Sequence, residues 1–170
     1  MMASASSPVA TSRMRFAVDK MLGRLARWLR IIGQDVAYGP HLSGTTLLGT
    51  ARREGRTILT RDTRVLRRRD LPPHLFIVSD RFREQLHQVV TQYGIDVYAC
   101  LLTRCLECNV ALVEVARPRV QGRVPPYVWA TQARFHVCPR CDRVFWAATH
   151  LERMRAELER LGMPPSSRSG

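Results

Sequence analysis

Lysine is almost absent from this chain, although the chain is strongly basic. Among its 170 residues Lys20 is the only lysine, and the formal net charge is +13. Nearly all the positive charge is therefore arginine, which binds phosphate through paired hydrogen bonds and stacks on bases. A GC-rich genome explains the choice of arginine over lysine, but it does not explain the excess of positive charge. The charge favours a nucleic-acid partner.

Long apolar runs and a secretory signal are also missing. The chain has no run of 18 apolar residues, so we expect no membrane-spanning segment. The start is small and polar without an apolar stretch, and we interpret residues 1–12 as a disordered leader and 163–170 as a disordered tail. The rest, in a chain that is 45% hydrophobic, is long enough for one domain of about 100 residues and a small module.

Cysteine is scarce but is arranged in two close pairs. One C-x-x-C pair is Cys105 and Cys108, and the other is Cys138 and Cys141. Four thiolates on two tight turns are the ligand set of a structural, tetrahedral zinc site. A disulfide framework and a redox C-x-x-C motif are the alternatives, and the presence of two pairs favours zinc. Thiolate ligands and the missing signal predict a reducing, cytoplasmic location.

Three residues near the pairs are weaker candidates for chemistry. Cys100 lies in the apolar run 97–102 and is expected to be a buried strand residue. His136 and His150 are alternative zinc ligands, but four cysteines already complete a tetrahedral shell.

The first ninety residues alternate between short apolar strands and amphipathic helices. This alternation predicts a three-layer α/β domain with a central parallel sheet, which we expect to span residues 13–97. A small β-rich zinc ribbon that ends in a helix is expected at 98–162. Strands are predicted at 15–18, 35–38, 57–60 and 75–78, and helices at 21–32, 45–54, 63–69, 81–93 and 151–161.

An acidic residue follows three of the four predicted strands. These residues are Asp19, Asp62 and Asp80. Open α/β sheets bind ligands at the carboxyl ends of their strands, where converging carboxylates require a hard cation. Mg²⁺ or Mn²⁺ bound there would activate water against a phosphodiester, so we predict the three aspartates as catalytic. The alternative is that Asp62 and Asp80 cap the helices that follow them.

Several stretches carry a resemblance to a known family. Residues 16–33 (FAVDKMLGRLARWLRIIG) and 58–62 (ILTRD) resemble the two signatures of the Mut-seven C-terminal domain RNases, a PIN-like family. Residues 104–109, 124–128 and 145–154 resemble the zinc-ribbon signatures of the same family, in the expected order. The resemblance implies a PIN-like nuclease fold, metal-dependent RNase activity and an appended ribbon. It also implies that Asp19 and Asp62 are the acidic residues of the site.

One stretch departs from the family pattern. Members usually carry an acidic pair at the start of the second helix, where this chain has Ser-Gly-Thr-Thr at 43–46. Hydroxyls can hold a metal-bound water but add no charge, so the site would rest on Asp19, Asp62 and either Asp80 or Asp96. The expected function is a metal-dependent endoribonuclease. The alternative is a non-catalytic RNA- or ribosome-binding protein on a decayed nuclease scaffold, and a toxin role is a third class.

Basic and aromatic residues define the expected RNA surface. Arginine takes phosphates and aromatic rings stack unpaired bases, although in a small module most aromatics fill the core. The nucleic-acid-binding residues predicted in the first domain are Lys20, Arg24, Arg27, Arg30 and Arg61. The ribbon candidates are Arg104, Arg117, Arg119, Arg123, Arg134, Arg140 and Arg143, with Tyr127, Trp129, Phe135, Phe145 and Trp146 between them.

Overall fold

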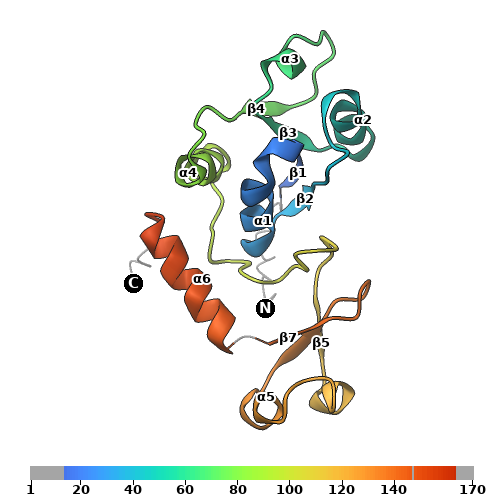
Figure 1. Cartoon of the computed structure of the whole chain (residues 1–170), viewed down its shortest axis with the longest axis vertical. Helices are drawn as coiled ribbons and strands as arrows, with labels where there is room; N and C mark the ends of the chain where they lie inside the picture. Colours follow the sequence, from blue (N-terminus) through green and yellow to red (C-terminus); the bar gives the residue numbers. More distant parts are fainter. Residues whose placement is uncertain (1–13, 147, 164–170) are drawn as a thin grey trace, which may run out of the picture.

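A computed structural model describes residues 14–146 and 148–163 of the chain. The predicted leader and most of the predicted tail lie outside these residues. Met163, which the sequence assigned to the tail, is buried, and its carbonyl accepts a hydrogen bond of 2.7 Å from the Tyr98 hydroxyl. None of the described helices is long and apolar enough to cross a bilayer. Figure 1 shows a parallel sheet flanked by helices in the upper part of the view and a smaller sheet below it.

The larger sheet has four parallel strands in the order β2-β1-β3-β4. β1 (Arg15–Val18) and β3 (Thr57–Thr60) have the predicted bounds, and β2 (Asp35–Ala37) is one residue shorter. β4 is His74–Phe76, shifted toward the N-terminus from the prediction of 75–78. It is an edge strand that leaves the sheet early, and Val78 is 72% exposed.

Alternate residues of β1 pack against two different helical layers. Phe16 and Val18 belong to the core that includes α1 (Gly23–Ile31) and α4 (Phe82–Tyr93). Ala17 belongs to the core on the opposite face, beneath α2 (Gly44–Glu54). This alternation is the period of two expected for a strand buried on both sides. The prediction of a three-layer α/β domain is confirmed.

Two predicted helices differ at their ends. The helix predicted at 21–32 begins as a separate 3-10 turn, η1 (Lys20–Leu22), before α1. The non-helical backbone of Leu22 separates the two, and the following Gly23 packs on Tyr38, where an added Cβ would lie 2.4 Å from the phenol oxygen. α3 (Thr63–Leu66) is shorter than the predicted 63–69, so the three arginines at 67–69 lie in a loop.

The apolar run 97–102 forms turns, and the prediction that Cys100 is a buried strand residue is wrong. Cys100 is half-buried, whereas Val97 and Leu101 point into the core around α1. The Leu102 amide donates to the Ile31 carbonyl at 2.7 Å, which ties the run to the end of α1. The run is therefore apolar because it covers the end of a helix.

The second module is a three-stranded antiparallel sheet of order β5-β6-β7. Its strands are β5 (Val113–Val115), β6 (Phe135–Val137) and β7 (Val144–Trp146), with η2 (Arg117–Val120) and α5 (Pro126–Thr131) between the first two. Phe135 is fully buried and Trp129 packs against it, whereas Tyr127 is 70% exposed.

The C-terminal helix α6 (Ala148–Arg160) returns to the α/β domain. Leu158 and Leu161 belong to the same buried cluster as α1 and α4, and the Arg83 guanidinium donates to the Leu161 carbonyl at 3.1 Å. The sequence grouped this helix with the ribbon, but its packing partners are those of the first domain. The helix starts three residues before the predicted 151, so His150 lies inside it.

Candidate functional site

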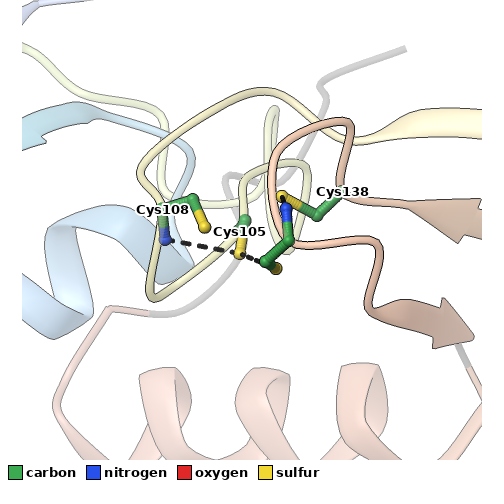
Figure 2. A group of neighbouring side chains, drawn as sticks. Cys105, Cys108 and Cys138 are labelled. Carbon is green, nitrogen blue, oxygen red and sulfur yellow. Dashed lines mark hydrogen bonds between the residues drawn. The ribbon is translucent and has the colours of Figure 1, made fainter.

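The four paired cysteines converge from two backbone turns of the same shape (Figure 2). In each turn, which we call a knuckle, the amide of the second cysteine donates to the sulfur of the first. Cys108 N lies 3.5 Å from Cys105 Sγ, and Cys141 N lies 3.4 Å from Cys138 Sγ. These donors stabilise thiolate charge on the first cysteine of each pair.

The residue after each pair adopts the left-handed conformation. Asn109 and Asp142 both have φ of 59°, and the amide of each donates to the carbonyl of the first cysteine of its pair at 2.9 Å. Asn and Asp tolerate this conformation better than other residues with a side chain. The presence of Asn or Asp directly after each C-x-x-C pair is therefore a sequence signal of this turn, and it was not among the predictions made above.

The cysteine cluster fits a tetrahedral metal ion. All four sulfurs lie within 4.8 Å of one another, and Cys105 Sγ and Cys141 Sγ are 3.9 Å apart. Four zinc–sulfur bonds of about 2.3 Å place the sulfurs about 3.8 Å apart. Among the described residues, no other three His, Cys, Asp or Glu side chains meet as closely. The four cysteines can thus bind a metal ion such as zinc, and His136 is outside the cluster.

Cys108 and Cys138 differ in their affinity for a proton. Desolvation and hydrogen bonds with the other thiols raise the pKa of Cys108 to about 12. Burial also opposes ionisation of Cys138, but the amides of Cys141 and Arg140 outweigh it and bring the pKa of Cys138 down to about 7. A metal ion must displace the protons that remain, so acid competes with metal at this site.

Asp19 occupies a buried position at the carboxyl end of β1. Its side chain is nearly inaccessible, and the residue is 2% exposed. Oδ2 accepts a hydrogen bond of 2.8 Å from the Thr60 hydroxyl, and Oδ1 accepts one of 3.3 Å from the Met21 amide, which caps η1. The carboxylate is thus held at the sheet edge by two donors.

Thr60 connects Asp19 to Asp62. Its hydroxyl donates to Asp19 and accepts from the Asp62 amide at 3.0 Å. The Thr60 hydroxyl thus links the Asp19 carboxylate to the backbone of Asp62 at the end of β3. Thr60 lies inside the ILTRD motif, yet its hydroxyl was not identified as a site group from the sequence.

Asp62 is both a helix cap and half of an ion pair. It accepts from the Arg64 amide at 2.9 Å, which caps α3, and from the Arg64 guanidinium, also at 2.9 Å. These hydrogen bonds hold the pKa of Asp62 below its ordinary value. Arg64 is 86% exposed, so it can leave the carboxylate with little loss of packing. The capping alternative for Asp62 is confirmed.

The remaining acidic candidates lie apart from this pair. Asp80 is exposed in the turn before α4, whose N-cap is Arg81, so the capping alternative for Asp80 is wrong. Among the described residues, Asp80 does not form with Asp19 and Asp62 a group of three side chains that could hold a metal ion directly. Asp96 follows the far end of α4, and its carboxylate accepts from the Tyr98 amide at 2.9 Å.

The start of α2 is occupied by hydroxyl groups. The Thr46 hydroxyl donates to the Ser43 carbonyl at 2.8 Å and accepts from the Ser43 amide at 3.3 Å, so it completes a capping box. Thr45 is exposed beside it, and the first turn of α2 holds no acid.

The basic residues predicted to bind RNA differ in how free their side chains are. Arg24 and Arg27 are exposed on α1, and the Arg24 guanidinium lies 4.3 Å above the Phe82 ring. Lys20 is exposed directly after Asp19, and Arg61 donates to the Val78 carbonyl at 3.0 Å.

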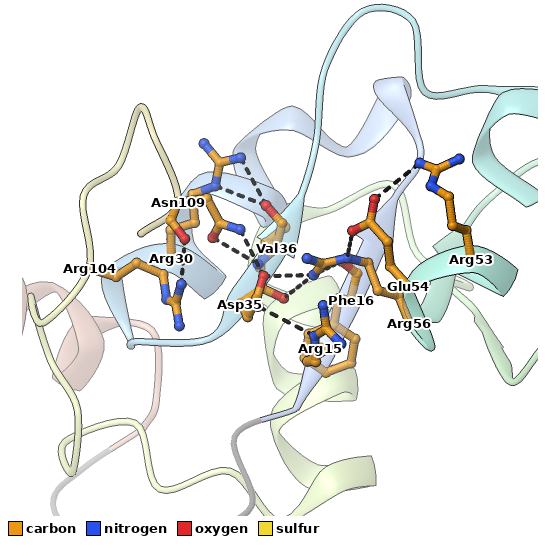
Figure 3. A network of polar contacts seen from close by, with 10 residues as sticks. All are labelled: Arg15, Phe16, Arg30, Asp35, Val36, Arg53, Glu54, Arg56, Arg104 and Asn109. Atoms are coloured by element: carbon orange, nitrogen blue, oxygen red, sulfur yellow. Dashed lines mark hydrogen bonds and ion pairs between the residues drawn. The ribbon is translucent and has the colours of Figure 1, made fainter. Parts of the chain in front are cut away.

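Arg30 is committed to the contact between α1 and the first knuckle. It donates to the Val36 carbonyl at 2.9 Å and to the Leu106 carbonyl at 2.6 Å, and burial lowers its pKa. Figure 3 shows its side chain beside Asn109 and Asp35. The sequence predicted that Arg30 binds RNA together with Arg24 and Arg27. In the structure its guanidinium instead makes the hydrogen bonds that join α1 to the first knuckle.

Asn109 bridges the first knuckle to β2. Its side-chain oxygen accepts from the Val36 amide at 2.9 Å, and its side-chain nitrogen donates to Asp35 Oδ1 at 2.8 Å (Figure 3). Arg56 donates to the same Asp35 oxygen at 2.6 Å. Partial burial alone would raise the pKa of Asp35, but the hydrogen bonds from Arg56 and Asn109 hold that pKa below its ordinary value.

These features define a class: a PIN-like α/β domain whose strand ends carry aspartates, joined to a cysteine ribbon. The family model of the Mut7-C RNAse domain matches residues 14–158, and the chain belongs to this family. A search of curated proteins gives no match.

Proposed function

We propose that this protein is a metal-dependent endoribonuclease that hydrolyses RNA phosphodiesters at the carboxyl edge of its parallel sheet. The observation that carries the proposal is the pair of Asp19 and Asp62 around Thr60, in a chain of an RNase family. Among the described residues, the buried Asp19 carboxylate has only two neutral donors and no ion-pair partner, a position in which a bound metal ion would compensate its charge, and this edge is where open α/β sheets bind ligands.

The donor set suits a hydrated Mg²⁺ or Mn²⁺. Such ions are held by one or two carboxylates and retain several waters, so Asp80 need only reach the site through water. Asp19 and Asp62 would hold the ion, which when bound lowers the pKa of a coordinated water and neutralises phosphate charge. Hydrogen bonds from Arg64 lower the pKa of Asp62 further and favour its ionised form. Arg64, once released, is placed to donate to the substrate phosphate.

The rest of the molecule would bind and hold the RNA. We assign phosphate contacts to Lys20, Arg24, Arg27 and Arg61, and base stacking on the ribbon to the exposed ring of Tyr127. The four cysteines would hold a structural zinc ion, and reduced thiolates fit a cytoplasmic location. We assign residues 13–97 to the nuclease domain and 98–162 to the segment that carries the ribbon, whose last helix, α6, packs on the nuclease domain.

Cleavage of a mixed RNA pool with added Mn²⁺ tests the proposal. The zinc-loaded protein should cut RNA, whereas Asp19→Asn should abolish cleavage and retain RNA binding. Arg64→Gln is an informative companion, because it frees Asp62 and should lower the Mn²⁺ concentration needed for half-maximal cleavage. Cleavage that persists in Asp19→Asn at wild-type rate would overturn the assignment of the site.

A non-catalytic RNA- or ribosome-binding protein is the second candidate. It is favoured by the acid-free first turn of α2 and by the failure of Asp80 to meet the other two aspartates closely. Thr45→Asp discriminates between the candidates, because it restores a carboxylate where the family usually has one. If neither wild-type protein nor Thr45→Asp cleaves RNA at high Mn²⁺, while both bind it, the second candidate holds.

A further inference from the structure

A crevice of about 280 Å³ lies between α2 and the loop that joins α3 to β4. Thr45, Leu48 and Arg52 line it from one face of α2, because they are spaced three and four residues apart. Arg68 and Arg69 line it from the loop, together with Asp70. We call this the arginine crevice. It holds three arginines against a single acid.

The loop that presents these arginines is anchored at both ends. Val65 is buried in the core beneath α2, and Leu71 packs against the same core. Arg52 reaches across from α2 and donates to the Asp70 carbonyl. Pro72 and Pro73 then restrict the chain before β4. The arginines are therefore displayed by a fixed segment, which reduces the entropy lost when a ligand binds.

Arg68 and Arg69 differ from most arginines of this domain in having unused donors. Arg56 pairs with Asp35 and Glu54, and Arg64 pairs with Asp62. In the described part of the chain, by contrast, Arg68 and Arg69 make no ion pair or side-chain hydrogen bond, although Asp70 is their neighbour. Two unpaired guanidinium groups in one crevice attract an anion with several acceptor oxygens.

The crevice begins near the proposed catalytic edge. Thr45 is in the first turn of α2, and α3, which leads into the loop, is capped by Asp62 itself. A second hollow of about 380 Å³ shares Arg52 and Asp70 with the crevice and extends it past Gly55 to Pro73. The second hollow adds only Arg56 to the basic residues, and this guanidinium is already paired with Asp35 and Glu54, so the arginines with unused donors lie in the crevice.

We propose that the arginine crevice binds the phosphodiester backbone of the RNA strand beyond the cleaved bond. The inference rests on the proposed function for the identity of the ligand as RNA. Arg68 and Arg69 supply forked donors to the phosphates. Contacts of this kind fix the position of the strand and carry no base specificity.

Binding of a labelled single-stranded RNA of about 12 nucleotides tests the crevice. Fluorescence anisotropy is measured over a range of salt, without added divalent metal and in an Asp19→Asn background, so cleavage plays no part. Arg68→Gln with Arg69→Gln should weaken binding about tenfold and reduce the slope of log K against log salt by about 1.4, at about 0.7 per phosphate.

The matched control removes the same charge elsewhere. Arg153 and Arg155 are exposed on α6, across the sheet from the crevice, and their double change to Gln should weaken binding less than about twofold. Equal losses in the two double variants would overturn the proposal, since only net charge would then matter. Full displacement of the RNA by millimolar uridine monophosphate would also overturn it, in favour of a mononucleotide pocket. The catalytic proposal is tested by a separate measurement, the cleavage of RNA by the protein that retains Asp19. Loss of cleavage there with crevice-dependent binding retained would contradict only the catalytic proposal.

Discussion

The two cysteine knuckles share one backbone geometry but are attached to different parts of the molecule. Asn109 and Asp142 occupy equivalent left-handed positions, with equal φ angles and equal hydrogen bonds to the first cysteine of each pair. Asn109 nevertheless reaches β2 of the α/β domain, whereas Asp142 pairs with Arg123 inside the ribbon. The backbone of the metal-binding turn is therefore the same in both knuckles. The side chain that follows each cysteine pair determines which part of the molecule the knuckle contacts.

The chemistry of the two side chains explains the division. An amide both donates and accepts, so Asn109 satisfies the Val36 amide and the Asp35 carboxylate at the same time. A carboxylate only accepts, which suits Asp142 beside an arginine. Asn109 thus joins the first knuckle to the α/β domain, and Asp142 joins the second knuckle to the ribbon.

Removal of a cysteine ligand should have the largest effect, and its consequences should distinguish the first knuckle from the second. Cys108→Ser and Cys141→Ser are each expected to lose the metal ion and unfold the ribbon, because three thiolates hold zinc far less well than four. Cys108→Ser should in addition expose the amides of β2 to hydrogen exchange. Metal content by mass spectrometry and exchange at residues 35–37 are the measurements. A full complement of metal in both variants would rule out the four-cysteine site.

Exchange of the two residues that follow the pairs tests the comparison directly. Asn109→Asp removes the donor to Asp35 and sets two carboxylates side by side, so it should cost about 2–3 kcal/mol of unfolding free energy. Asp142→Asn breaks a pair that is largely exposed on the aspartate side and should cost less than about 1 kcal/mol. Both residues tolerate the left-handed backbone. Urea unfolding at neutral pH gives both values, and similar costs would show that the knuckles are equivalent.

Arginine substitutions on α1 should separate stability from RNA binding. Arg30→Met leaves the Val36 and Leu106 carbonyls without their donor and should cost about 1–3 kcal/mol. Arg27→Met, on the exposed face of the same helix, should change stability by less than about 0.5 kcal/mol but weaken RNA binding and its salt dependence. Thermal unfolding and anisotropy on both variants provide the comparison. A stable Arg30→Met protein with impaired RNA binding would return Arg30 to the RNA surface.

The smallest expected effect is a pH dependence that comes from Asp35. Its pKa is lower in the folded state, so its stabilising contribution is complete above the ordinary carboxyl value, about 3.9, and fades as the pH falls through the folded value. Asp35→Asn should reduce the loss of unfolding free energy at acidic pH. Acid also displaces metal from the cysteines in both proteins, so the difference between their two unfolding curves is the measurement. Parallel curves would show that Asp35 has the same pKa folded and unfolded.

Features with a local cause could be predicted from the sequence. The C-x-x-C pairs, the strands that end in Asp19 and Asp62, and the cap at Asp62 each depend on a few neighbouring residues. Arg30 could not be predicted, because its spacing from Arg24 and Arg27 is that of a solvent-facing helix stripe. One of its carbonyl partners, Leu106, lies 76 residues away in the chain. The apolar run around Cys100 was wrongly predicted to be a strand for the same reason. Its apolar residues pack against the end of α1, which is distant in the chain, and do not form part of a sheet.

The return of α6 to the first domain has a consequence for the order of events during synthesis. Leu158, Leu161 and Met163 close a core whose other members are made much earlier, from Phe16 onward. On the ribosome, the whole cysteine ribbon therefore emerges before the core of the α/β domain can be completed. A chain that stops within the ribbon would carry an open hydrophobic face on α1 and α4 and would be a target for chaperones and proteases. Metal loading of the ribbon can thus precede completion of the α/β core.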